Sequence, residues 1–142
     1  DLSIFRDDYA DLVYACHVLE HIQHTALRKT LWEWRRILKP GGVLRLSVPD
    51  FDKIVHIYES TDRNINSILD PLMGGQDYQY NVHYAAFNHS YLADKLKEVG
   101  FSEVRKWDPD SVEYHDFQDW ANSDIVREGK AFAVSLNLEA IK

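Results

Sequence analysis

The sequence predicts an α/β fold in which parallel strands are followed by an antiparallel pair and flanked by helices. A short apolar run at residues 11–16 precedes a helical pattern over 25–38 and a second apolar run at 43–49. Strand, helix and strand in this order form the right-handed crossover that joins neighbouring parallel strands. Residues 101–107 and 131–141 have the pattern of two further strands, which we expect to pair with each other as an antiparallel ribbon.

Composition limits the class of protein. The chain has 142 residues, 45% of them hydrophobic, so we expect one domain over residues 1–142. Lys and Arg total 16 against 23 Asp and Glu, and the net charge of -7 provides no broad cationic surface for nucleic acid or anionic lipid. No apolar run approaches the roughly 20 residues of a membrane span, so we expect no membrane partner. Cys16 is the single cysteine, which excludes an internal disulfide and favours a reducing, cytoplasmic setting.

The first three elements follow from their apolar spacing. Residues 11–16, DLVYAC, combine β-branched and aromatic side chains, which suits a buried strand of a parallel sheet. Between residues 25 and 38 the apolar side chains recur with a helical period, at Leu27, Leu31, Trp34 and Leu38. The segment Lys39-Pro40-Gly41-Gly42 should end this helix, because proline cannot continue it and glycine tolerates a left-handed turn. Residues 43–49 then form the second strand.

The middle of the chain has one clear helix and one irregular stretch. Asp50 is a suitable N-cap for a helix over residues 50–60. Residues 63–80 contain Pro71 and the pair Gly74-Gly75, which predict a short helix followed by a mobile loop.

The last third contains a helix, an insertion and the closing strands. The helix over residues 88–100 should begin at a cap on Asn88 or Ser90 and end at Gly100. Residues 108–130 are polar and aromatic and are long for a hairpin connection, and such insertions are often functional.

One motif after the first strand allows two interpretations. His17, Glu20 and His21 spell H-x-x-E-H, the pattern of an inverted zinc-peptidase site, and His24 adds a third imidazole. A zinc peptidase needs both histidines on one established helix, whereas these residues follow a strand at the turn toward a helix. We therefore assign no metal ligands and expect a ligand-binding corner at the end of the strand. Hydrogen-bonded structural histidines and a histidine-based metal protein are the alternatives.

Several segments together resemble a known family. FRDDYADLVYACHVLEHI (5–22), LWEWRRILKPGGVLRLSVPDF (31–51) and YLADKLKEVGF (91–101) are similar to the second half of class I S-adenosylmethionine-dependent methyltransferases of type 11. The resemblance implies a partial Rossmann-like methyltransferase sheet, with parallel strands, a C-terminal antiparallel hairpin and flanking helices. It also implies S-adenosylmethionine as the cofactor and methyl transfer to a small-molecule or glycan-type acceptor.

The resemblance also assigns residues to the cofactor. Asp1 and Leu2 occupy the position of the adenine-contacting segment, and Cys16 and His17 that of the segment under the methionine end. His21 is then expected to face the substrate.

Two loop-like segments supply the remaining candidates, YNVHYAAF (80–87) and EYHDFQDW (113–120). His83 has the chemistry of a general base near neutral pH, and Asp116 could orient His115 or bind a hydroxyl or amine of the substrate. We therefore assign catalysis to His83, His115 and Asp116, with packing as the alternative. The predicted substrate-binding residues are His21, Asn81, Tyr84 and Trp120.

The family's Gly-rich cofactor turn has no counterpart in this sequence. The six glycines form no G-x-G after a strand, and the resemblance starts in the middle of the family's domain. We therefore expect an N-terminally truncated domain that binds cofactor weakly or not at all by itself. Residues 11–16 would form an open sheet edge and drive formation of a homo-oligomer. The alternative function is a non-catalytic remnant that acts as an oligomerising or binding module.

Overall fold

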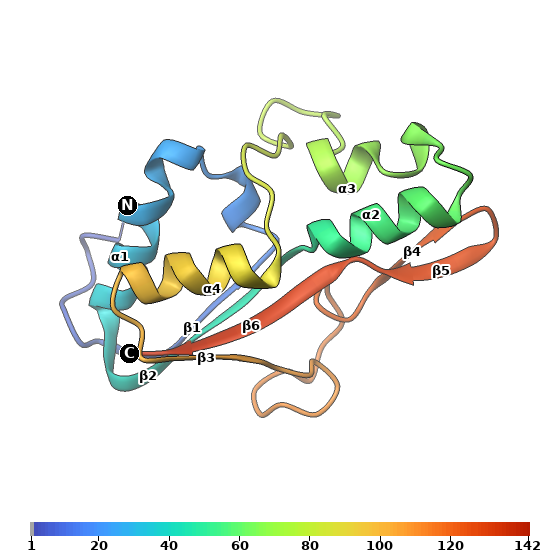
Figure 1. The fold of residues 1–142 in the computed structure, drawn as a ribbon. Coiled ribbons are helices and arrows are strands. Elements are labelled where there is room, and N and C mark those ends of the chain that lie inside the picture. The colour runs from blue at the N-terminus through green and yellow to red at the C-terminus, as the bar shows by residue number, and fades with distance from the viewer. Residues whose placement is uncertain (1) are drawn as a thin grey trace.

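Strand β2 (Leu38–Pro49) lies inside a four-stranded sheet in the computed structural model, which describes residues 2–142 (Figure 1). It pairs in parallel with β1 (Ala10–Cys16) and antiparallel with β6 (Ser135–Ile141). Strand β6 also pairs antiparallel with β3 (Glu103–Lys106), which gives the order β1-β2-β6-β3. The predicted α/β fold, with parallel strands and a C-terminal antiparallel pair, is confirmed.

Helices lie along one side of the sheet, and the segment after β3 runs along the other (Figure 1). None of the helices within residues 2–142 has the length and apolar character that crossing a membrane requires. The remaining elements are η1 (Leu19–His21), η2 (His24–Ala26), α1 (Leu27–Ile37), α2 (Phe51–Ser60), η3 (Ile65–Ser67), α3 (Leu69–Met73), α4 (His89–Glu98), β4 (Asp124–Arg127) and β5 (Lys130–Ala133).

The main core lies between the sheet and helices α1 and α4. Alternate side chains of β2 point toward these helices, because successive residues of a strand face opposite sides of the sheet. Leu44, Leu46 and Val48 are fully buried there. The stripe predicted for the first helix is also confirmed as buried, at Leu27, Leu31, Trp34 and Leu38.

The prediction of one continuous strand over residues 131–141 is wrong, because the segment is divided into β5 and β6. Strand β5 pairs with β4 in a separate two-stranded ribbon, so the long insertion contains a strand. Val134 lies at the break, where its carbonyl accepts a hydrogen bond from the Asp50 backbone N–H at 2.8 Å. Its side chain packs with Ile54 and Ile57 of α2 in a second core cluster. The apolar residues of AFAVSL continue through the break, so the sequence pattern does not reveal it.

The predicted helix caps are confirmed. The Asp50 side chain accepts a hydrogen bond from the Asp52 N–H at the start of α2. At the start of α4, Asn88 rather than Ser90 accepts one from the Tyr91 N–H. Gly100 follows α4 with φ of 96°, a left-handed conformation that glycine adopts without steric cost.

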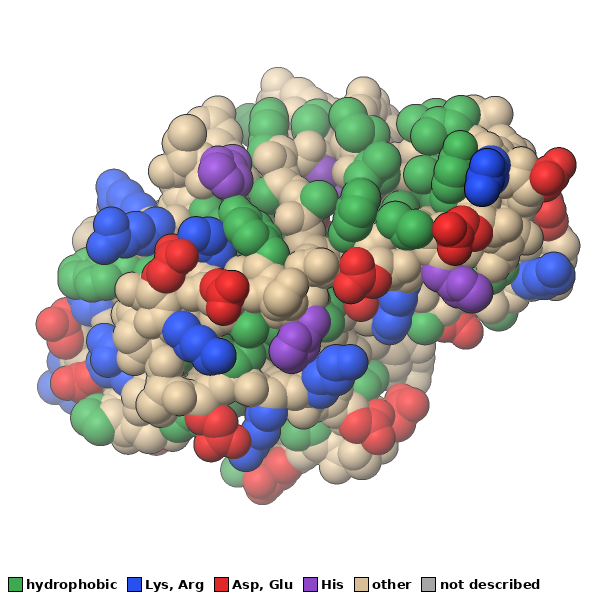
Figure 2. Space-filling model, viewed as in Figure 1, with side chains coloured by type: hydrophobic (Ala, Val, Ile, Leu, Met, Phe, Trp, Pro, Cys, Tyr) green, Lys and Arg blue, Asp and Glu red, His purple; other side chains and the backbone are tan. Residues whose placement is uncertain are grey.

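A patch of exposed apolar side chains covers part of α2 and α3, where hydrophobic side chains gather in Figure 2. Phe51 and Val55 of α2 and Leu69 and Met73 of α3 belong to it, each about two-fifths exposed. Contiguous patches of this kind are typical of interaction surfaces.

The opposite face of the sheet is polar and buried. Arg45 of β2 and Glu139 of β6 form an ion pair of 2.8 Å, with side chains only 6% and 5% exposed. The Arg45 guanidinium also donates to the Glu113 carbonyl and lies 5.2 Å from the centre of the Trp107 ring. Arg105, which is about half exposed, holds the second Glu139 oxygen at 3.1 Å. This network fixes the segment after β3 against the sheet.

Replacing Arg45 tests how much this network contributes to the stability of the fold. We expect Arg45→Met to lower the free energy of unfolding by about 3 kcal/mol or more, because Glu139 would remain buried with only its exposed partner. Arg105→Met should cost less than about 1 kcal/mol, since that pair is open to solvent. Urea denaturation of both variants measures the difference, and equal losses would contradict the assignment.

Candidate functional site

A pocket of about 550 Å³ opens at the carboxyl ends of β1 and β2. This is the edge at which sheets of parallel strands bind ligands, and the volume lies within the range of small-molecule sites. The opposite wall comes from the segment around α3 and from the ribbon β4–β5. The lining residues are Cys16, His17, Glu20, His21, Pro49, Asp70, Pro71, Gly74, Gly75, Tyr78, Asn81, His83, Trp120, Ile125, Arg127 and Val134.

His17 is the first residue after β1 and has a left-handed backbone, with φ of 48°. That conformation costs roughly 1–2 kcal/mol for a residue other than glycine. A hydrogen bond from the His17 N–H to the Ser47 carbonyl, at 2.8 Å, holds it beside β2. The ring stacks on Trp120 with centres 5.6 Å apart, so the strained turn delivers the imidazole into the pocket wall.

Hydrogen bonding assigns the protons of His17. The Ser135 hydroxyl donates to the Trp120 carbonyl at 2.6 Å, so its oxygen accepts from His17 Nε2 at 2.8 Å. Burial, with smaller contributions from His83 and His21, lowers the pKa of His17 to about 4. The ring is therefore neutral at pH 7, with its proton on Nε2 and an unprotonated Nδ1.

Glu20 is a buried carboxyl on the pocket wall. Its side chain is 1% exposed, and neither carboxyl oxygen has a hydrogen-bond partner within residues 2–142. His17 Nδ1 lies 3.3 Å from Glu20 Oε1. Burial raises the pKa of Glu20 to about 8, which keeps the carboxyl protonated at pH 7 when no cation is near.

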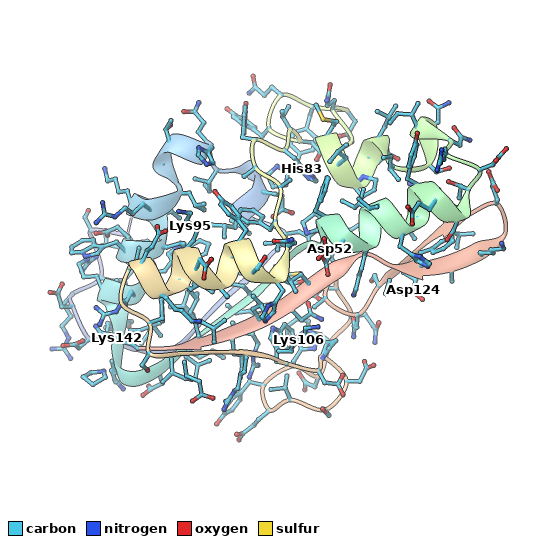
Figure 3. All side chains as sticks on the ribbon, in the orientation of Figure 1. Asp52, His83, Lys95, Lys106, Asp124 and Lys142 are labelled. Carbon is cyan, nitrogen blue, oxygen red and sulfur yellow. The ribbon has the colours of Figure 1, made fainter. Side chains whose placement is uncertain are left out.

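The segment before α4 is tied to the end of β1 and carries His83, which is labelled in Figure 3. The Tyr84 N–H donates to the Glu20 carbonyl at 2.8 Å, and His21 Nδ1 bonds the Val82 carbonyl at 3.1 Å. The rings of His21 and His83 meet edge to face with centres 4.9 Å apart. Burial and the neighbouring His21 lower the pKa of His83, and hydrogen bonds to the backbone of Pro71 and Leu72 partly offset this.

A compact loop closes this wall of the pocket. Gly74 has φ of 79°, and a Cβ there would lie 2.5 Å from the Asn81 carbonyl oxygen, so only glycine fits. The Asn81 carbonyl accepts from the Gln76 N–H, and its side-chain amide donates to Asp77 at 2.6 Å. Asn81 therefore shapes the loop as well as lining the pocket.

The structure brings together six of the residues proposed from the sequence. The predicted residues that line the pocket are Cys16, His17, His21, Asn81, His83 and Trp120. Leu2 packs instead against the main core, and the exposed Tyr84 ring is not among the lining residues. Asp1 lies outside the described residues.

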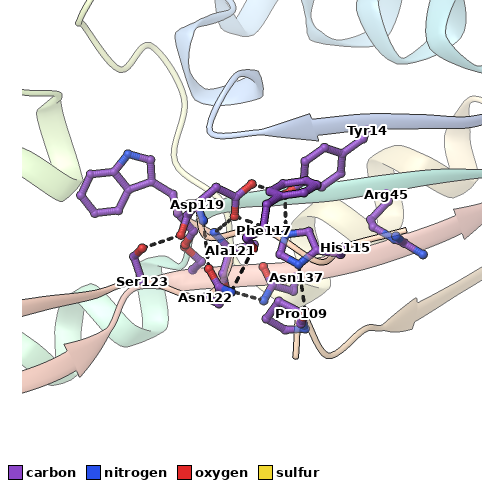
Figure 4. Close-up of polar contacts among 12 residues, drawn as sticks. Tyr14, Arg45, Pro109, His115, Phe117, Asp119, Ala121, Asn122, Ser123 and Asn137 are labelled. Carbon is purple, nitrogen blue, oxygen red and sulfur yellow. Dashed lines mark hydrogen bonds and ion pairs between the residues drawn. The ribbon is translucent and has the colours of Figure 1, made fainter. Parts of the chain in front are cut away.

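His115 and Asp116 lie away from the pocket, and His115 belongs to a separate network beneath the sheet (Figure 4). Its Nδ1 bonds the Pro109 carbonyl at 2.8 Å, and its Nε2 lies 3.3 Å from the Tyr14 hydroxyl. The nearby carboxylate is Asp119, 3.4 Å from Nε2, whereas Asp116 is exposed. Asp119 accepts a hydrogen bond from the Tyr14 hydroxyl. Burial by itself would raise the pKa of Asp119, but the hydrogen bonds from Tyr14 and the Ala121 N–H, together with smaller contributions, lower it.

Four residues that we did not propose from the sequence are important in the structure. Glu20 and Arg127 line the pocket, Ser135 holds the His17 ring, and Asp119 belongs to the network beneath the sheet. The sequence did contain a signal for Glu20 as a site residue, because Glu20 is the acidic member of H-x-x-E-H. Arg127 lines the pocket and lies 3.5 Å from Asp70, although the sequence separates the two by a helix and an insertion. No local pattern distinguishes Ser135 or Asp119 from neighbouring polar residues.

Comparisons with known proteins agree with the resemblance. Residues 1–46 match the family model of the methyltransferase domain. No curated protein matched the chain. Solved methyltransferase structures match nearly the whole of this chain with part of their own length, so the expected partial class I methyltransferase fold is confirmed.

Three of these structures illustrate the similarity. A SAM-dependent methyltransferase from Archaeoglobus fulgidus is 16% identical with a TM-score of 0.58, and the match covers 99% of this chain and 63% of that one. Burkholderia thailandensis 1,6-didemethyltoxoflavin-N1-methyltransferase, bound to 1,6-didemethyltoxoflavin and S-adenosylhomocysteine, is 15% identical with a TM-score of 0.57, covering 99% and 47%. A complex that contains the Haloferax volcanii Trm112 methyltransferase activator gives 17% identity and a TM-score of 0.55, covering 99% and 57%. The chain thus spans less than two thirds of each of these proteins.

The thiol of Cys16 gives a pH test of the site. Burial raises its pKa to about 11, although a hydrogen bond with Tyr14 acts in the opposite direction. Because only the thiolate reacts, alkylation by iodoacetamide should be roughly 100-fold slower at pH 8 than for an equally accessible thiol of ordinary pKa. The rate should rise about tenfold per pH unit up to pH 10.

Glutathione serves as the reference thiol in the same series. A Cys16 rate that levels off below pH 9, alongside glutathione, would contradict the assignment.

Proposed function

We propose that the protein is an S-adenosylmethionine-dependent methyltransferase whose pocket at the ends of β1 and β2 receives the methionine end of the cofactor and the acceptor. The match of residues 1–46 to the methyltransferase domain supports this proposal, and so does the fold shared with solved methyltransferases. The observation that carries it is the pocket itself, because it brings Cys16 and His17 together with His21, Asn81 and Trp120. Methyl transfer depends chiefly on holding the sulfonium methyl in line with a nucleophile and excluding water.

The chain's residues have distinct roles in this proposal. Cys16 and His17 lie under the methionine end, with the His17 ring fixed by Ser135 and Trp120. Trp120 and His21, which both line the pocket, face the acceptor. His83 is the pocket residue proposed as a general base, because its lowered pKa leaves it unprotonated at pH 7. His115 and Asp116 keep their predicted catalytic role only if a substrate reaches the network beneath the sheet.

Several polar side chains line the pocket, which favours a small polar or glycan-type acceptor. Both hydrogen-bond donors and acceptors line the pocket, from the side chains of Asp70, Asn81 and Arg127. Residues 1–142 are proposed to hold only part of the cofactor, so weak binding of S-adenosylhomocysteine by this chain alone belongs to the same proposal. A cytoplasmic location remains a prediction from the single cysteine.

A methyl-transfer assay tests the function. The natural protein that carries these residues is incubated with tritiated S-adenosylmethionine and sets of phenols, amines, sugars and carboxylates, and transfer to one set is expected. His83→Ala should then lower kcat at least about 100-fold if His83 is the base. His89→Ala, an exposed histidine at the start of α4, is the matched control and should retain wild-type rates.

Failure of every acceptor class, together with no measurable cofactor binding by the natural protein, would refute the proposal. A His83 variant with unchanged kcat would refute only the assignment of the base.

A second candidate function is an oligomerising module, and the edge of the sheet favours it. Within residues 2–142, β1 is paired only with β2 and leaves its other edge without a neighbour. Unpaired edges bind further strands, so the proposed partner is a second copy of this chain. Residues 10–16 would supply the contact.

Light scattering at high protein concentration tests this association. We expect the chain to form dimers or larger species, and Leu12→Lys should shift it toward the monomer, because edge lysines oppose strand pairing. Asp94→Lys makes the same kind of change at an exposed residue of α4, outside this edge, and should associate as the wild type does. A strictly monomeric wild-type chain would refute this candidate.

A further inference from the structure

We propose that Glu20, His21 and His83 form a binding site for a first-row divalent cation on the wall of the pocket. One potential ligand atom from each side chain lies within 4.8 Å of the other two. All three residues line the same pocket, so a bound ion would face its interior. These side chains would bind the ion whether or not the protein transfers methyl groups.

The three side chains would need to move only slightly toward one another to bind an ion. Ligands about 2.1 Å from a tetrahedral or octahedral ion lie roughly 3.0–3.5 Å from each other. The most distant pair would therefore approach by about 1–2 Å, which side-chain rotation can supply. The backbone already fixes the two segments together, because the Tyr84 N–H bonds the Glu20 carbonyl.

Glu20 provides the independent observation that points to a cation. Its carboxyl is 1% exposed, and neither oxygen has a hydrogen-bond partner within residues 2–142. His17 Nδ1 lies 3.3 Å from Oε1, but it is unprotonated and has no hydrogen to donate to the carboxylate. A buried polar group without a partner destabilises a fold by about 1–3 kcal/mol, so such groups are normally satisfied. A cation between Glu20, His21 and His83 would satisfy this carboxylate directly.

The two histidines are oriented as metal ligands usually are. His21 Nδ1 bonds the Val82 carbonyl at 3.1 Å, and since a carbonyl only accepts, Nδ1 carries the proton and Nε2 has a free lone pair. His83 likewise has backbone hydrogen-bond partners at Pro71 and Leu72. Histidine ligands commonly donate their second N–H to a carbonyl in this way, which fixes the ring and raises its basicity.

The ligand set indicates the class of ion. Two imidazoles and one carboxylate suit Mn²⁺, Fe²⁺, Co²⁺ or Zn²⁺, whereas Mg²⁺ and Ca²⁺ prefer oxygen ligands. Three protein ligands leave at least one coordination position open toward the pocket. If the proposed function holds, an oxygen of the acceptor would occupy that position. His83 would then be a ligand in place of a base, because a metal-bound nitrogen has no free lone pair.

This site differs from the zinc-peptidase pattern in the sequence. His17 does not belong to the cluster, because the ligand atoms that lie within 4.8 Å of one another come from Glu20, His21 and His83. The third ligand comes instead from a segment 62 residues beyond His21.

Metal titration tests the proposal. The full chain, expressed without a histidine tag and stripped with EDTA, is titrated with Mn²⁺ while electron paramagnetic resonance follows free Mn²⁺, and Zn²⁺ is titrated by calorimetry. We expect one equivalent of either ion to bind. Glu20→Gln and His83→Ala should each weaken binding by at least about 100-fold, the upper range for loss of a group that merely supports a ligand.

His24→Ala is the matched control, because His24 lies three residues after His21 and bonds the Tyr91 hydroxyl outside the cluster. It should bind the ions as wild type does. Circular dichroism checks the fold of each variant, and Glu20→Gln keeps the size of the buried group. Wild-type protein that binds neither ion, or folded Glu20→Gln and His83→Ala proteins with wild-type affinity, would overturn the proposal. No cofactor or acceptor is present, so the outcome is separate from that of the methyl-transfer assay.

Discussion

Strand β2 is hydrogen-bonded along both edges. This double pairing positions the residues of β1 and β6 that meet at the pocket. On one edge the Ser47 carbonyl holds the His17 N–H where β1 ends. On the other edge Pro49 is opposite Ser135 of β6, whose hydroxyl contacts the His17 ring. Residues 118 positions apart thus meet at one point. Asp50 continues the same strand end, capping α2 and pairing with Phe87 just before α4. A shift of register in β2 would move all of these groups together.

The two faces of this sheet are stabilised by different physics. Apolar burial against α1 and α4 holds one face, with Leu44 and Leu46 fully buried. The other face holds the ion pair of Arg45 and Glu139 out of water, where desolvation is costly unless every group is satisfied. The segment after β3 satisfies it, through the Glu113 carbonyl and the Trp107 ring. This segment also contains Trp120, so the polar face and part of the pocket wall are built from one piece of chain.

Most of the fold could be predicted because its periodic elements are local. The α1 stripe and the caps at Asp50 and Asn88 depend on residues a few positions apart. The break at Val134 depends on packing against α2, which no local pattern records. In the site, Cys16, His17 and His21 could be recognised from one motif. The burial of Glu20 could not, since glutamate is normally exposed and the segment that Tyr84 ties to the Glu20 backbone is more than 60 residues away in the sequence. Likewise, nothing in EYHDFQDW indicates that Asp119 rather than Asp116 approaches Tyr14.

The loop that Gly74 closes has a consequence for how this protein can change over evolutionary time. Residues 74–83 contribute a wall of the pocket but lie outside the four-stranded sheet. Substitutions there alter the shape and polarity presented to a bound molecule while leaving strand register intact. Gly74 itself is the exception, because any side chain would collide with Asn81. Related proteins should therefore diverge around a fixed glycine, acquiring new ligand preferences without having to rebuild the scaffold.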